Sequence, residues 1–148
     1  MTTTAIRRLQ FCAGHRVLGH ESKCANPHGH NYVVFLHARG IRQDLDGLGR
    51  VIDFSVLKEK IGSWIEEKWD HTSILFSEDR ELIAAMERFE ATKKVFIMPM
   101  NPTAENMARY LLDFVAPHQL ENTGVEVFKV ALWETENCLA EVTKAEGI

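Results

Sequence analysis

The stretch that decides the fold is residues 24–36, which read CANPHGHNYVVFL. Its second half is rich in β-branched and aromatic side chains, which favour a rigid β-strand. Side chains alternate between the two faces of a strand, so His28 and His30 project from one side, about 6 to 7 Å apart along the chain. Two side chains at this separation can bind one metal ion. The stretch therefore predicts a strand that begins with a metal site.

A third metal ligand is expected, because a catalytic zinc site usually takes three ligands from the protein and leaves one position open. His15 is the best candidate, since it ends an apolar segment, residues 9–15, in which alternate residues share one strand face. His37 falls on the face opposite to His28 and His30 and is excluded. The sequence thus predicts Zn²⁺ bound by His15, His28 and His30.

Two roles stay open for Cys24, which precedes the histidines. It could be a fourth ligand that closes a structural site, or a reactive thiol beside an open site, where a nearby cation would lower its pKa. Cys12 and Cys138 are interpreted as small apolar residues inside strands. Three cysteines with no regular pairing, in a chain without an N-terminal signal sequence, predict a reducing cytoplasm.

The order of the expected elements indicates the α+β class. Two strands precede two helices, and two strands follow them, which favours a four-stranded antiparallel sheet with both helices on one face. Asp53 is the expected N-cap of the first helix and Asn101, followed by Pro102, that of the second. The strands are expected near 4–15, 28–39, 124–134 and 138–143, and the helices near 54–69 and 103–116.

Length and charge narrow the function classes. A chain of 148 residues, 45% hydrophobic and without an apolar run of transmembrane length, predicts one domain over 1–148. The net charge of −4 disfavours a nucleic-acid-coating surface. Residues 1–50 nevertheless hold seven Lys and Arg against three Asp and Glu. An anionic substrate would favour this basic excess, with Arg16 and Lys23 the nearest basic residues to the metal motif.

Five motifs together resemble one family. They are FCAGHR at 11–16, CANPHGH at 24–30, WDH at 69–71, NPTAEN at 101–106 and WET at 133–135. In this order they resemble the 6-pyruvoyl-tetrahydropterin synthase and 6-carboxytetrahydropterin synthase family. The resemblance implies the tunnelling fold, in which the sheets of several subunits close into a barrel and active sites form between neighbours. It also implies a homo-oligomer, a hexamer built as a dimer of trimers.

The resemblance implies roles for nine residues. The zinc ligands are His15, His28 and His30, the proton-transfer groups are Cys24, Asp70 and His71, and the pterin is bound by Glu134 with Thr103 and Glu105. A carboxylate that continues the apolar face of a strand, as Glu134 does, can accept the two parallel donors of a pterin edge. Structural interpretations without a catalytic or binding role also exist. Asp70 and His71 could simply end a helix, and Thr103 and Glu105 could simply begin one. Glu134 could be an ordinary turn residue.

Residues 72–100 depart from the compact family pattern and predict an added helix and strand. Ser77 or Asp79 could cap a helix that runs to about Phe89, and the sequence KVFIM at 94–98 predicts a short strand before a proline.

The activity implied by the resemblance is a zinc-dependent lyase reaction on 7,8-dihydroneopterin triphosphate, with no membrane or nucleic-acid partner. The pyruvoyl enzyme eliminates triphosphate, whereas the carboxy enzyme also releases acetaldehyde, on the way to queuosine. Three residues separate Cys24 from His28, and this short spacing favours the carboxy enzyme. A pyruvoyl enzyme is the alternative, and a non-catalytic zinc- or pterin-binding module is the alternative of another class.

Overall fold

The computed structural model describes residues 1–89 and 95–145. The strands in these ranges form a single mixed sheet, in the order β4-β3-β1-β2-β5-β6. β1, β2, β5 and β6 are antiparallel neighbours, whereas β3 runs parallel to β1 and β4 parallel to β3. The strands are β1 (Ala5–His15), β2 (His28–Gly40), β3 (Thr72–Phe76), β4 (Val95–Met98), β5 (Val125–Thr135) and β6 (Cys138–Thr143).

The α+β class is confirmed, but the prediction of a four-stranded antiparallel sheet is wrong. The sheet has six strands because residues 72–76, for which no strand was predicted, form β3 beside β1 and β4 then pairs with β3. Ile74 and Leu75 are almost fully buried there. The strand predicted near 94–98 is confirmed as β4, and it pairs with β3 at the edge of the sheet.

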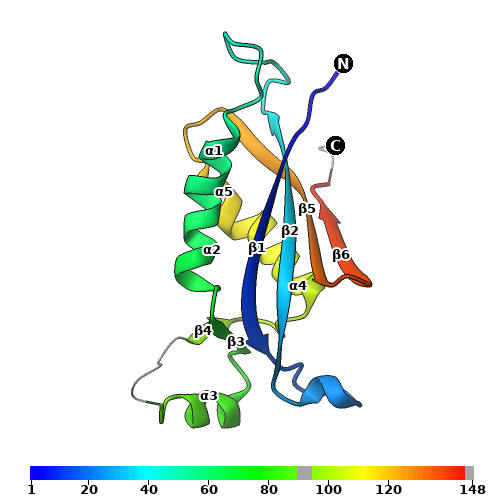
Figure 1. Ribbon diagram of the computed structural model, residues 1–148, viewed down its shortest axis with the longest axis vertical. Coiled ribbons are helices and arrows are strands. Elements are labelled where there is room, and N and C mark those ends of the chain that lie inside the picture. Colours follow the sequence, from blue (N-terminus) through cyan, green and yellow to red (C-terminus); the bar gives the residue numbers. More distant parts are fainter. Residues whose placement is uncertain (90–94, 146–148) are drawn as a thin grey trace.

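Two helical segments cover one face of the sheet (Figure 1). Each contains a π-helical turn, at Lys58–Gly62 between α1 (Phe54–Leu57) and α2 (Ser63–Lys68), and at Leu111–Val115 between α4 (Ala104–Tyr110) and α5 (Ala116–Gln119). The predicted cap Asp53 is confirmed, since its side chain accepts the Ser55 N–H at 2.9 Å. No helix in the described ranges is long and apolar enough to cross a membrane.

The second helical segment begins two residues later than predicted. Its N-cap is Thr103, whose hydroxyl accepts the Asn106 N–H at 3.1 Å, and not Asn101. The Asn101 side chain is engaged elsewhere: its amide accepts the Leu18 N–H at 2.9 Å and donates to the Leu18 carbonyl at 3.0 Å. Asn101 therefore ties the start of this helix to the chain that follows β1.

The core lies between the helices and the face of β2 that carries Tyr32, Val34 and Leu36, all fully buried. Phe11 of β1 stacks on Tyr32, with ring centroids 4.9 Å apart. His28 and His30 have the same strand parity as Tyr32, so they extend this core face to the end of the sheet.

The segment between β3 and β4 contains α3 (Arg80–Met86), whose N-cap is Asp79. The predicted helix is thus confirmed, although it ends before Phe89; residues 90–94 lie outside the described ranges. Asp79 is 2% exposed and accepts two hydrogen bonds from Arg16, one of them from Nε at 2.6 Å. Because Arg16 directly follows His15, this ion pair fastens the added helix to the end of β1.

Replacing Asp79 with asparagine should lower the free energy of unfolding by about 3 kcal/mol, the low end of the range for a broken buried ion pair. Asparagine keeps an oxygen that can cap α3, so the variant removes mainly the charge. The low end applies because the Arg16 side chain stays 16% exposed and can be partly solvated. Urea unfolding at one fixed protein concentration measures the change.

Glu81→Gln is the matched control. Glu81 lies 3.8 Å from the same guanidinium, but its side chain is 91% exposed. An exposed pair contributes about 0 to 1 kcal/mol, so this variant should differ little from the wild type. Equal effects of the two substitutions would contradict a special role for Asp79.

Candidate active site

Three imidazoles converge where β1 ends and β2 begins. His15 and His28 are paired in the β1–β2 register, and His30 is opposite Ala13. One ring nitrogen from each of His15, His28 and His30 lies within 4.8 Å of the others, and the Nε2 atoms of His15 and His28 are 3.1 Å apart. His15 is 3% exposed, so the cluster has a buried base. The structure therefore brings together all three residues that were predicted as metal ligands.

Main-chain carbonyls orient two of the rings. The Nδ1 atom of His15 lies 2.6 Å from the carbonyl oxygen of Pro102, and that of His28 lies 2.6 Å from the carbonyl oxygen of Asn26. A carbonyl only accepts, so each Nδ1 carries the proton and donates it. The Nε2 lone pairs are left to face the centre of the cluster, which is the arrangement that metal-binding histidines commonly have.

His30 supplies a direct sign that a metal ion fits this cluster. Its Nε2 atom is buried and has no hydrogen-bond partner, although buried polar atoms are normally paired. Burial lowers the pKa of His30, which keeps the ring in the neutral form that binds metals. Three neutral imidazole nitrogens around one point are a donor set suited to zinc.

Glu134 reaches the same point from the end of β5. Its Oε1 atom is 3.3 Å from the Nε2 atoms of both His15 and His30. In the metal-free protein a ring that carries a second proton, on Nε2, can pair with Glu134. The hydrogen bond from His15 in that state, together with the charge of the protonated imidazoles, holds the pKa of Glu134 below its usual value, against the opposing effect of burial. A carboxylate charged at neutral pH thus borders the histidine cluster.

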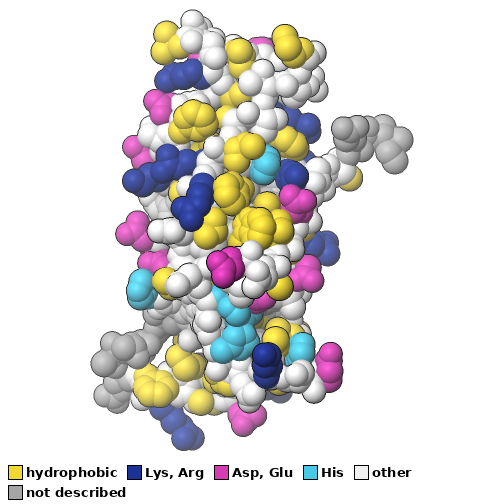
Figure 2. Space-filling view, turned by 45° about the vertical axis from the view of Figure 1, so that its right-hand side comes forward, with side chains coloured by type: hydrophobic (Ala, Val, Ile, Leu, Met, Phe, Trp, Pro, Cys, Tyr) yellow, Lys and Arg dark blue, Asp and Glu magenta, His cyan; other side chains and the backbone are white. Residues whose placement is uncertain are grey.

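Two pockets meet at Glu134. One, of about 740 Å³, lies against the apolar side chains of Val33, Phe35 and Trp133. The other, of about 360 Å³, has Glu105 in its wall, so the structure brings the predicted residues Glu105 and Glu134 together. Figure 2 shows apolar side chains gathered beside histidine side chains on this side of the molecule.

The motif at 101–106 contributes more through its main chain than the sequence indicated. The Pro102 carbonyl holds His15, and Thr103, predicted to bind substrate, uses its hydroxyl as the cap of α4. Asn101 and Pro102 were not predicted as site residues. The sequence indicated such a contact only in general terms. A buried metal-binding histidine needs a hydrogen-bond acceptor for its second ring nitrogen, but the sequence does not say which residue supplies it.

Asp70 and His71 form a close pair, with Oδ2 of Asp70 2.9 Å from Nδ1 of His71. Adjacent residues rarely face each other, but His71 has a positive φ of 56°, and this left-handed conformation brings its ring back toward Asp70. Oδ1 of Asp70 accepts the Cys12 N–H at 2.9 Å, and the His71 N–H donates to the Cys12 carbonyl at 2.6 Å. The pair is therefore fixed to β1.

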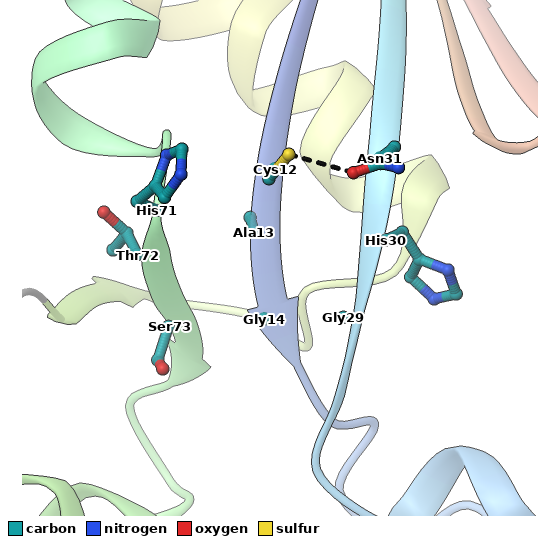
Figure 3. A pocket seen from close by; sticks show the side chains of 9 residues that line it. All are labelled: Cys12, Ala13, Gly14, Gly29, His30, Asn31, His71, Thr72 and Ser73. Carbon is teal, nitrogen blue, oxygen red and sulfur yellow. Dashed lines mark hydrogen bonds between the residues drawn. The ribbon is translucent and has the colours of Figure 1, made fainter.

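This pair does not lie with the three histidines. Thr72 pairs with Ala13, and both are buried on the helix-covered face, so the residues beside them project from the other face. There His71 borders a pocket of about 440 Å³ with Cys12, Asn31 and Ser73; His30 also lines this pocket, but its ring points away from His71 (Figure 3). The Cys12 thiol donates to Oδ1 of Asn31 at 2.9 Å.

Cys12 and Cys138, interpreted from the sequence as small apolar residues inside strands, are both exposed. They lie in strands, as expected, but on positions that the core does not cover. Cys24 is half-buried in a 3₁₀ turn, Lys23–Ala25, whose Cys24 carbonyl accepts the Val17 N–H at 2.9 Å.

Comparison with known proteins decides the family. The family model of 6-pyruvoyl tetrahydropterin synthase matches residues 4–145. The chain belongs to this family. A relative from Rickettsia bellii, 38% identical over 92% of this chain and 96% of its own length, is named 6-carboxy-5,6,7,8-tetrahydropterin synthase.

Solved structures agree with the tetrahydropterin synthase fold. A protein from Wolinella succinogenes superposes with a TM-score of 0.82 at 22% identity, over 97% of this chain and 98% of that one. The 6-pyruvoyl tetrahydropterin synthase of Caenorhabditis elegans superposes with a TM-score of 0.67 at 24% identity, over 97% and 96% of the two chains. At these identities the likeness concerns the fold alone.

In this member of the tetrahydropterin synthase family, the group that could hold a metal ion comprises the three histidines, and among the described residues Cys24 lies outside it. This geometry favours the open-site role of Cys24 over the closed structural site. Arg16, considered above for an anionic substrate, is instead occupied by Asp79, and that pairing raises the pKa of the guanidinium.

Proposed function

We propose that the chain is a zinc-dependent 6-carboxy-5,6,7,8-tetrahydropterin synthase. This lyase converts 7,8-dihydroneopterin triphosphate to 6-carboxytetrahydropterin and releases acetaldehyde and triphosphate, in the pathway to queuosine. The observation that carries the proposal is the group of three Nε2 atoms that face one point beside the Glu134 carboxylate. The name of the Rickettsia bellii relative and the short spacing between Cys24 and His28 support the carboxy reaction.

His15, His28 and His30 would hold the zinc ion. When bound, zinc supplies a Lewis acid that polarises oxygen atoms of the substrate side chain and stabilises developing negative charge. The carbonyls of Pro102 and Asn26 keep two of the imidazoles in the required tautomer. Partial burial of the cluster strengthens these electrostatic effects, because water screens charges less there.

The carboxylate of Glu134 would accept hydrogen bonds from two N–H groups of the pterin ring. Carboxylates in general accept the two parallel N–H groups of an arginine in the same way. The apolar walls formed by Val33, Phe35 and Trp133 suit a flat aromatic ligand. Glu105 borders the second pocket at Glu134 and would contact the same ligand. Thr103 would act mainly through the helix start that it caps.

Proton transfer is assigned to Cys24 and to the Asp70–His71 pair. The Cys24 thiol lies in the turn just before the ligand His28, and a bound cation would favour its thiolate. Asp70 lies beside His71, and histidine is the side chain that most often transfers protons in general acid–base catalysis. His71 projects from the face opposite to His15, so within one chain the two groups do not converge.

A site shared between copies of the chain resolves this separation. β3 covers β1 only at residues 13–15, so residues 5–12 of β1 have no strand partner on that side among the described residues. Such edges promote pairing with another chain. Ile6 on β1 and Leu139 on β6 are also exposed. We propose a homo-oligomer, a hexamer of two trimers whose sheets close into barrels, in which His71 serves a neighbour's metal centre.

A cytoplasmic location is part of the proposal. Cys12, Cys24 and Cys138 are all free thiols, which suits a reducing compartment.

The test is incubation of the zinc-loaded protein with 7,8-dihydroneopterin triphosphate, followed by identification of the products. Carboxytetrahydropterin with an equal amount of acetaldehyde is expected. A 6-pyruvoyl product without acetaldehyde would instead identify the pyruvoyl enzyme. Binding of pterin without any turnover would identify a non-catalytic module.

A further inference from the structure

The Glu134 carboxylate lies closer to the histidine nitrogens than a residue that only binds pterin needs to be. Its Oε1 atom is 3.3 Å from Nε2 of His15 and 3.3 Å from Nε2 of His30. The Nε2 atoms of His15 and His28 are 3.1 Å apart. The Glu134 oxygen thus lies beside two of the three ring nitrogens, at the edge of the compact group that His15, His28 and His30 form.

These three distances, out of the six between four donor atoms, are close to the edge length of a coordination tetrahedron. With metal–ligand bonds of about 2.0 to 2.1 Å, neighbouring donor atoms of a tetrahedral zinc site are about 3.3 to 3.4 Å apart. Carboxylate oxygen is also an accepted zinc ligand beside imidazole nitrogen. A water molecule is therefore not required at the fourth position of this site.

We infer that Glu134 is a fourth, displaceable ligand that closes the metal site when no pterin is bound. The inference rests on the proposed function for the identity of the ion and of the pterin. The same carboxylate oxygens would then bind either the ion or the N–H groups of the pterin ring. Binding of the ring would draw Glu134 away and open one coordination position to the substrate oxygens.

The location of Glu134 suits such an exchange. It lies next to the last residue of β5, and its side chain is 27% exposed, whereas the side chain of His15 is 1% exposed. The histidines are fixed by strand pairing and, at His15 and His28, by main-chain carbonyls, whereas the carboxylate is the more exposed group. Glu134 lines two pockets, from which a ring could approach it.

The experiment is titration of the metal-free protein with Co²⁺, which reports its coordination through visible absorption. Wild-type protein should show the intense spectrum of four-coordinate cobalt. Glu134→Gln should bind Co²⁺ at least about tenfold more weakly, because the loss of a residue that merely supports the metal ligands already weakens binding by about that factor. The spectrum of this variant should be weaker and shifted. Adding 7,8-dihydroneopterin should shift the wild-type spectrum toward that of the variant.

Glu136→Gln is the matched control, because Glu136 follows in the same turn, borders the same pocket and carries the same charge. It should keep the wild-type affinity and spectrum. An unchanged spectrum of Glu134→Gln overturns the inference, whether the affinity is unchanged or is lower through lost charge alone. These outcomes do not depend on turnover: a wild-type protein that forms no carboxytetrahydropterin refutes the proposed function and leaves the cobalt result standing.

Discussion

Cys24→Ala is expected to lose at least about a hundredfold in turnover while it keeps its fold and its zinc, since general acid–base groups contribute about that much or more. The described metal cluster contains three histidines and not Cys24, so the thiol is not needed to hold the ion. Its half-buried turn immediately precedes the ligand strand β2. Acetaldehyde release measures the rate, and elemental analysis measures the zinc.

Cys24→Ser is the companion variant, because serine has nearly the same size but a far less acidic hydroxyl. It should be nearly as slow as Cys24→Ala. Recovery of activity with serine would show that packing, and not proton transfer, explains the loss. Loss of zinc in both variants would instead support the closed structural site, with Cys24 as a ligand.

The antiparallel part of the fold could be predicted from the sequence within one or two residues. β1, β2 and β5 are 11 to 13 residues long, and apolar side chains recur along them with strand spacing, so local pattern and final structure agree. β6, with six residues, follows β5 across a short polar turn. β3 has five residues, and its burial comes from a partner strand more than fifty residues earlier. No local periodicity reports such a parallel pairing.

The metal cluster could also be predicted, because the spacing of His28 and His30 on one strand fixes their direction. The supporting contacts could not. Pro102 acts through its carbonyl, a group that every residue has, so nothing in the sequence distinguishes it. The position of the Asp70–His71 pair on the opposite face depended on which edge β3 joins, and the sequence alone left that open. The N-cap of α4 was missed because Asn101, a strong cap by type, is bound to Leu18.

Co-expression of His28→Ala with His71→Ala is expected to restore activity that neither variant has alone. His28→Ala should lose most of its metal, because one of three ligands is missing, but it keeps Asp70 and His71. His71→Ala keeps the metal cluster. If each active site takes its metal from one chain and His71 from its neighbour, about a quarter of the sites in randomly mixed oligomers are complete. Different affinity tags on the two variants allow mixed oligomers to be purified and assayed.

The control is co-expression of His28→Ala with Cys24→Ala, in which both defects affect the same half of the site. A metal-bearing half with an intact thiol never forms in that mixture, so its activity should not exceed that of the two variants measured separately. If the mixture with His71→Ala is equally inactive, the Asp70–His71 pair does not serve a neighbouring chain. The hydrogen bonds that Asp70 accepts from the Cys12 N–H and that the His71 N–H donates to the Cys12 carbonyl would then have only a structural role, that of fixing the start of β3 to β1.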